Sequence, residues 1–171
     1  AVDRHLNGSR APLAVVALPR TLGRLKHHLD YREALFDNDA IDPQSLDPKA
    51  LHKHALGVVG PRLNEERETL RERLRAALGG AGAAHETSLQ NILKAAEEGR
   101  VETVFLAVGK TVWGHYDAAH RAARIDSESG PENEDLLNLA ALKTLATGGD
   151  VRTLPEDLAD DIGPIAALMR Y

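Results

Sequence analysis

The chain has 171 residues, of which 43% are hydrophobic and 4% aromatic, and none is cysteine. This length can bury one substantial aliphatic core or two small ones, while the missing cysteines exclude a disulfide framework, a thiolate metal site and a cysteine nucleophile and fit a reducing cytoplasm. The formal charge of −5 is uneven, because residues 1–78 hold 13 Lys or Arg against 11 Asp or Glu and residues 79–171 hold 8 against 15, so RNA contact is expected in the first part and protein contact in the second.

The first half alternates a strand with helices. An aliphatic run at 13–18 is typical of a strand buried on both faces, and Asp47 followed by Pro48 predicts a helix start. The predicted elements are a strand at 13–18, a helix at 20–29, a surface loop at 37–48, a helix from Pro48 to Leu56 and a long helix at 61–78. The small residues Gly79–Gly82 then indicate a domain boundary, which divides the chain into domains at 1–80 and 85–171.

The second half predicts a further α/β arrangement. Thr87 and Gln90 have the spacing of a capping box at the start of a helix, and Glu134 and Asp135 lie where a helix dipole favours negative charge. The predicted elements are a helix ending at Gly99, a buried strand at 101–108, an antiparallel pair at 111–116 and 121–125, a helix beginning at 132–135, a strand at 151–154, a loop and a strand at 165–170. No apolar run approaches the roughly twenty residues needed to span a bilayer.

Two motifs that could bind a phosphate group or a metal ion are incomplete. Gly109, Lys110 and Thr111 follow a strand as in a phosphate-binding loop, but that motif needs a glycine where Val104 stands. His52 and His54 lie two residues apart, which places them on different faces of a helix. The sequence therefore predicts solvated or locally bonded histidines, with no metal, cofactor or catalytic site.

Two surfaces are candidates for binding. Arg67, Arg71 and Arg75 recur every four residues and form a basic row that could contact RNA phosphates, although pairing with Glu68 and Glu72 on a solvated face is the more ordinary interpretation. Trp113 and His115 fall on one side of a predicted strand. An exposed Trp113 could anchor a partner, although core packing is favoured by the usual burial of tryptophan.

A family resemblance is carried by the last residues, EDLLNLAALKTLATGGDVRTLP and the terminal AALMRY. This segment resembles the end of the C-terminal domain of the archaeal and eukaryotic peptide-chain release factor and Pelota superfamily, in particular its bacterial branch. Residues 88–108 are similar to the opening helix and strand of that domain. Residues 12–29 and 61–78 resemble, more loosely, parts of the family's middle domain.

The resemblance implies an α/β chain, with the end of a middle domain followed by a complete α/β sandwich of the kink-turn-binding ribosomal-protein type. Because residues 2–6 read as the tail of a helix and no Met begins the chain, a longer parent is expected. The implied function is a cytoplasmic, ribosome-associated factor in termination, rescue of stalled ribosomes or dormancy that acts by binding, with the ribosome and a translational GTPase as partners. A hydrolase of peptidyl-tRNA or RNA with its active loop upstream, and an RNA-binding module, stay open as alternatives.

Overall fold

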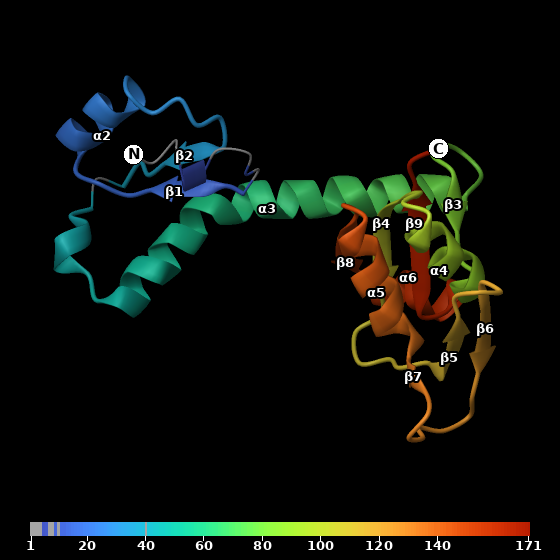
Figure 1. Ribbon diagram of the computed structural model, residues 1–171. Helices are drawn as coiled ribbons and strands as arrows, with labels where there is room; N and C mark the ends of the chain where they lie inside the picture. Colours follow the sequence, from blue (N-terminus) through green and yellow to red (C-terminus); the bar gives the residue numbers. More distant parts are fainter. Residues whose placement is uncertain (1–4, 7–8, 10, 40) are drawn as a thin grey trace. The chain divides into compact units, whose positions relative to one another are not determined.

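The structure, a computed structural model, describes residues 5–6, 9, 11–39 and 41–171. The helix tail predicted at residues 2–6 lies mostly outside this part of the chain. The fold is mixed α/β, as predicted, and it divides into two compact units at residues 1–69 and 70–171. Each unit has its own sheet (Figure 1).

The N-terminal unit contains a small β-α-β arrangement. Strands β1 (Leu13–Val15) and β2 (Ala34–Phe36) pair in parallel and are joined by helix α2 (Pro19–Lys26). The predicted strand at 13–18 is therefore shorter than expected, and its residues are half-buried rather than buried on both faces. The described residues of this unit contain two paired strands, which cannot cover β1 as a wider sheet would.

Helix α3 (Pro48–Leu78) is continuous where the sequence predicted two helices, with Pro61 inside it. The predicted start is confirmed, because Asp47 Oδ1 accepts the backbone N–H groups of Lys49 at 2.8 Å and Ala50 at 3.0 Å. Before it, a short 3₁₀ helix, η1 (Pro43–Ser45), interrupts the loop predicted at 37–48.

The C-terminal unit is built on a four-stranded sheet in the order β3-β9-β4-β8. Its strands are β3 (His85–Glu86), β4 (Val101–Leu106), β8 (Asp150–Thr153) and β9 (Ile165–Met169). Strand β9 is antiparallel to β3 and β4, whereas β8 is parallel to β4. The strands predicted at 101–108, 151–154 and 165–170 are thus confirmed with small changes at their ends.

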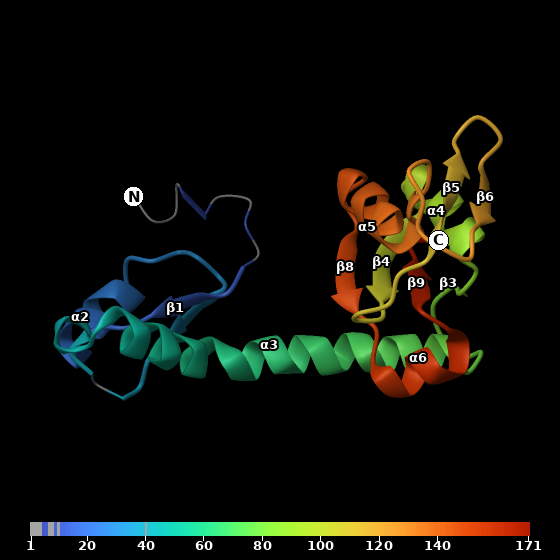
Figure 2. The ribbon, with the colours of Figure 1, turned by 90° about the horizontal axis from the view of Figure 1, so that it is seen from below.

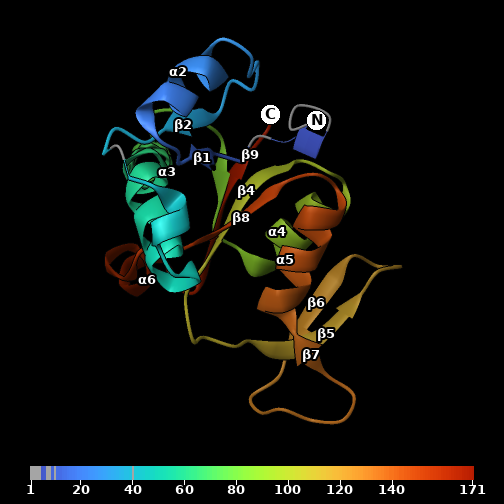
Figure 3. The ribbon, with the colours of Figure 1, turned by 90° about the vertical axis from the view of Figure 1, so that its left-hand side faces the viewer.

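Helices cover both faces of this sheet, so the unit has three layers (Figures 2 and 3). On one face, α4 (Leu89–Glu97) and α5 (Leu136–Ala146) bury a cluster that includes Val104 and Ala167. The opposite face receives the last turns of α3 and helix α6 (Glu156–Ile162), which pack with Phe105 and Leu168. Because side chains alternate along a strand, adjacent residues of β4 and β9 serve different cores.

Two local predictions were wrong. The segment predicted as a loop before β9 contains α6, whose apolar side chains pack beneath the sheet. Helix α4 begins after Ser88 without a side-chain cap, and instead Glu86 Oε1 accepts the N–H groups of Thr87 and Ser88, both at 2.9 Å. Glu86 therefore accepts the N–H of the N-cap residue Ser88, which is one half of the predicted capping box.

A second, three-stranded sheet lies beside α4 and α5 in the order β6-β5-β7. It consists of β5 (Trp113–Asp117), β6 (Ala122–Ile125) and β7 (Glu134–Asp135). The predicted antiparallel pair is confirmed. Glu134 and Asp135 precede α5 as predicted, and Asp135 Oδ1 caps the helix by accepting the N–H of Leu137 at 3.0 Å. The two residues also pair with β5, which the sequence did not predict.

The units divide the chain within α3, whereas the sequence predicted domains that end and begin at residues 80 and 85. That domain assignment stays a prediction. Among the described residues, no helix combines the length and the apolar character that crossing a membrane requires.

Candidate functional site

The basic row on α3 is tied to α6 where it enters the C-terminal unit. Arg71 Nη2 lies 2.8 Å from Asp157 Oδ1, and Arg75 Nη2 lies 2.5 Å from Asp157 Oδ2. The hydrogen bond from Arg75, with the charges of both arginines, lowers the pKa of Asp157 despite the opposing cost of desolvation. One carboxylate therefore bridges two cations and offsets part of the positive charge of the row.

The other arginines of α3 have different surroundings. Arg67, in the N-terminal unit, places Nη1 3.5 Å from Asn64 Oδ1. Arg73 makes a two-pronged ion pair with Glu102 on β4, at 2.9 and 3.0 Å, and this pairing raises the pKa of the arginine. Arg73 thus anchors α3 to the sheet, whereas Arg71 and Arg75 face α6.

Trp113 and His115 lie on the outer face of β5. The residues between and after them, Gly114 and Tyr116, are buried on the inner face, whereas Trp113 is half-buried and His115 is exposed. Trp113 belongs to neither core of the unit, which differs from the packing that its residue type favoured. His115 is directly opposite Arg124 on β6, so the outer face combines an indole, an imidazole and a guanidinium.

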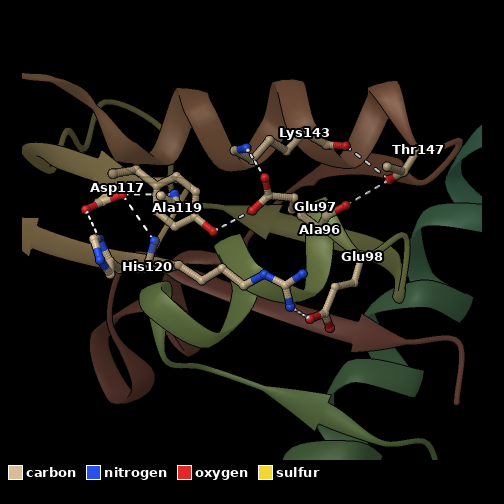
Figure 4. Close-up of polar contacts among 10 residues, drawn as sticks. Ala96, Glu97, Glu98, Asp117, Ala119, His120, Lys143 and Thr147 are labelled. Atoms are coloured by element: carbon tan, nitrogen blue, oxygen red, sulfur yellow. Dashed lines mark hydrogen bonds and ion pairs between the residues drawn. The ribbon is translucent and has the colours of Figure 1, made fainter.

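The inner face of the same hairpin is fixed to α4 and α5 (Figure 4). The Tyr116 hydroxyl donates to Glu97 Oε2 at 2.7 Å, and Lys143 Nζ lies 3.5 Å from Glu97 Oε1 and 4.9 Å from the centre of the tyrosine ring. Burial, and then the hydrogen bond to Glu97, raise the pKa of Tyr116 to about 12. These contacts hold the hairpin in place with its outer face turned away from α4 and α5.

The turn between β5 and β6 is also tied down. Arg121, at φ 51°, is the non-glycine residue with positive φ among the described residues, and its Nη1 pairs with Glu98 on α4. Asp117 Oδ1 accepts the N–H groups of Ala119 at 2.9 Å and His120 at 3.2 Å. The hydrogen bond from His120 lowers the pKa of Asp117, and the same contact raises the pKa of His120. The turn is therefore shaped by polar contacts rather than by glycine.

The N-terminal unit contains a cavity that the sequence did not predict. It has a volume of about 610 Å³ and lies between the loop after β2 and the first turns of α3. Asp37, which is only 4% exposed, lines this cavity, and its Oδ2 lies 2.9 Å from His54 Nε2. His54 is therefore paired with a buried carboxylate, within the locally bonded class that the sequence predicted. Because Asp37 begins the segment predicted as a surface loop, nothing in the sequence indicated this pairing.

Comparisons with known proteins define the class. The model of bacterial archaeo-eukaryotic release factor family 3 matches residues 1–100. A search among curated proteins found no match. The match covers more than half of the chain, and it falls mainly on the part where the resemblance drawn from the sequence was looser.

Several solved structures are distantly similar. The C-terminal domain of a peptide chain release factor from Methanosarcina mazei is 12% identical with a TM-score of 0.48, over 74% of this chain and 96% of that one. Archaeoglobus fulgidus Pelota is 17% identical with a TM-score of 0.38, over 99% and 52%. S. cerevisiae Dom34, described as a translation termination-like factor that interacts with Hbs1, is 12% identical with a TM-score of 0.45, over 99% and 51%. The chain thus spans about half the length of the Pelota and Dom34 chains.

The fold and the family match together assign the class: a mixed α/β protein related to translation factors. The chain belongs to bacterial archaeo-eukaryotic release factor family 3. This confirms the superfamily predicted from the sequence.

Proposed function

We propose that this protein is a cytoplasmic, ribosome-associated factor that acts by binding, in termination, rescue of stalled ribosomes or dormancy. The observation that carries the proposal is the family match over residues 1–100. Fold alone does not define an activity, so the proposal also needs surfaces that suit binding to a large ribonucleoprotein. The chain offers two.

The first proposed surface is the outer face of the β5–β6 hairpin, defined by Trp113, His115 and Arg124. Aromatic and arginine side chains dominate the energetics of many interfaces, and aromatic rings and guanidinium planes also stack on unpaired RNA bases. The side chain of Arg124 is 77% exposed, although its Nε lies 3.2 Å from Asp126 Oδ1. Because the inner face is held by Tyr116 and Glu97, this surface is preorganised and loses little entropy on binding.

The second proposed surface is the basic row, Arg67, Arg71 and Arg75. The bridge from Asp157 weakens its attraction for phosphate, so we assign it a supporting role. Residues 70–171 carry 11 Lys or Arg against 16 Asp or Glu, a balance of −5. This negative balance favours a protein partner for the rest of the unit, and a translational GTPase is the partner class that we propose.

The test is equilibrium binding of the full-length protein to purified ribosomes at near-physiological salt. The double variant His115→Ala/Arg124→Ala should weaken binding by roughly tenfold or more, the scale of losing one interface hot spot. Arg152→Ala removes a matched exposed charge from β8, on the other sheet, and should leave binding within about twofold of the original. Equal effects of the two changes would refute the hairpin surface, and absence of binding by the unaltered protein would refute the function.

A further inference from the structure

Three metal-ligating side chains converge at the edge of the N-terminal cavity. Asp37 and Asp39 come from the loop after β2, and His54 comes from the second turn of α3. One ligand atom from each residue lies within 4.8 Å of the other two. Among the described residues, no other group of three or more His, Cys, Asp or Glu side chains meets this condition.

The local structure holds two of these ligands firmly. The carboxylate of Asp37 is buried, with Oδ1 accepting the N–H of Asp39 at 3.0 Å and Oδ2 in contact with His54 Nε2 at 2.9 Å. A buried carboxylate is costly unless it is paired with a cation or a hydrogen-bond donor.

The cavity beside the pair of Asp37 and His54 has room for further ligands of a metal ion. It is lined by the three ligands, by Asn38 and Lys53, and by apolar side chains that include Phe36 and Val58. An ion held at its edge could therefore complete its coordination with water or with a small molecule.

We propose that Asp37, Asp39 and His54 bind a divalent transition-metal ion, with Zn²⁺ as the best match. One imidazole nitrogen and two carboxylate oxygens form a ligand set that Zn²⁺ accepts, and sites with three protein ligands keep a position open. Two aspartates and a neutral histidine carry a charge of −2, which a divalent ion neutralises. Binding replaces the contact between His54 Nε2 and Asp37 Oδ2, because the nitrogen must give its lone pair to the ion, and any proton on it passes to solvent.

The site is independent of ribosome binding and is tested by direct metal binding. The whole chain, stripped of metal with a chelator, is titrated with Zn²⁺ and separately with Mg²⁺ by calorimetry, and bound metal is counted after dialysis. We expect one Zn²⁺ per chain, weaker binding of Mg²⁺, and an absorption-edge spectrum with nitrogen and oxygen ligands, since the chain contains no cysteine.

Variants decide whether the ion occupies this site. Asp39→Asn changes an exposed side chain without altering its shape. It should weaken Zn²⁺ binding by tenfold or more, because changes even to residues that only support metal ligands typically lower metal affinity by about 10- to 100-fold. His54→Gln should abolish the stoichiometric site, with folding checked by circular dichroism. His52→Gln, an exposed histidine two residues away on the same helix, is the matched control and should have no effect. Failure to bind Zn²⁺, or equal binding by the Asp39→Asn and His52→Gln variants, would overturn the proposal.

Discussion

Leu74 tests whether the last turns of α3 belong to the core of the C-terminal unit. Its side chain is fully buried against the sheet and α6. Leu74→Ala removes three carbons, worth about 2.4 kcal/mol of transfer free energy at about 0.8 kcal/mol each. The cavity left behind adds about 1 kcal/mol when the site relaxes only partly. We therefore expect the free energy of unfolding to fall by about 3 to 4 kcal/mol.

The assay is urea and thermal unfolding of the whole chain. For a unit of this size, a loss of 3 kcal/mol lowers the midpoint temperature by roughly 12 °C or more. The matched control is Leu142→Ala on α5, in the same unit, where the leucine is 56% exposed and the loss should stay below about 1 kcal/mol. A Leu74→Ala effect no larger than that of Leu142→Ala would show that α3 does not pack on this sheet and would refute the reasoning.

Three further changes test local features. A Cβ at Gly114 would overlap the Arg124 carbonyl oxygen and lie 2.6 Å from Leu136 Cδ1, so Gly114→Ala should lower the unfolding free energy by about 1 to 3 kcal/mol, whereas Gly130→Ala, whose nearest contact is 3.8 Å away, should not. Gly57→Ala lies within continuous α3, is not followed by proline and has no atom within 4 Å, so it should raise thermal stability by about 0.5 to 1 kcal/mol; a loss would place a break there. Ultraviolet titration should show one tyrosine ionising near pH 12, and because the folded pKa of Tyr116 is raised from 10.0 to about 12, its contribution to stability is present below pH 10 and is lost as the pH rises toward 12. The absence of an ionisation near pH 12, or the persistence of that ionisation in Tyr116→Phe, would contradict the buried contact.

Periodicity predicted most of the C-terminal unit, and capping predicted the start of α3 in the N-terminal unit. The apolar strand at 101–108, the hairpin and the Asp47 cap depend on residues near one another in the chain, and these predictions were confirmed. Helix α6 was missed because it is short and rich in aspartate. Its helical state depends on Leu158 and Ile162 packing beneath the sheet, a long-range contact that local sequence does not report.

The continuity of α3 is a second case in which a local sequence signal was misleading. Pro61 lacks the N–H of a helical turn and its ring normally breaks the helix, which led to two predicted helices. In the structure, Arg62 follows Pro61 and pairs with Glu66 at 3.1 Å and reaches Glu33 at 4.0 Å near β2. These exposed pairs are individually weak, but they connect the turn after the proline to both the helix and the strand region.

The candidate sites also depend on contacts between residues that are far apart in the sequence. Alternation along β5 was sufficient to place Trp113 and His115 on one face, but Arg124 joins them only through the strand register. The bridge from Asp157 to Arg71 and Arg75 spans more than eighty positions in the chain. His54 was compared with His52 because they are close in sequence, whereas its partner is seventeen residues earlier. Spacing rules detect ligand sets on one element and miss those assembled from two.

The most direct test of ribosome association is sucrose-gradient sedimentation of the full-length protein, tagged at its native level, from growing and from stationary cells. The fractions are compared at near-physiological and at raised salt, because nonspecific attraction to phosphates falls steeply with salt. We predict co-migration with ribosomal particles that persists at the higher salt in at least one growth state. Recovery at the top of the gradient under every condition would contradict the proposed function.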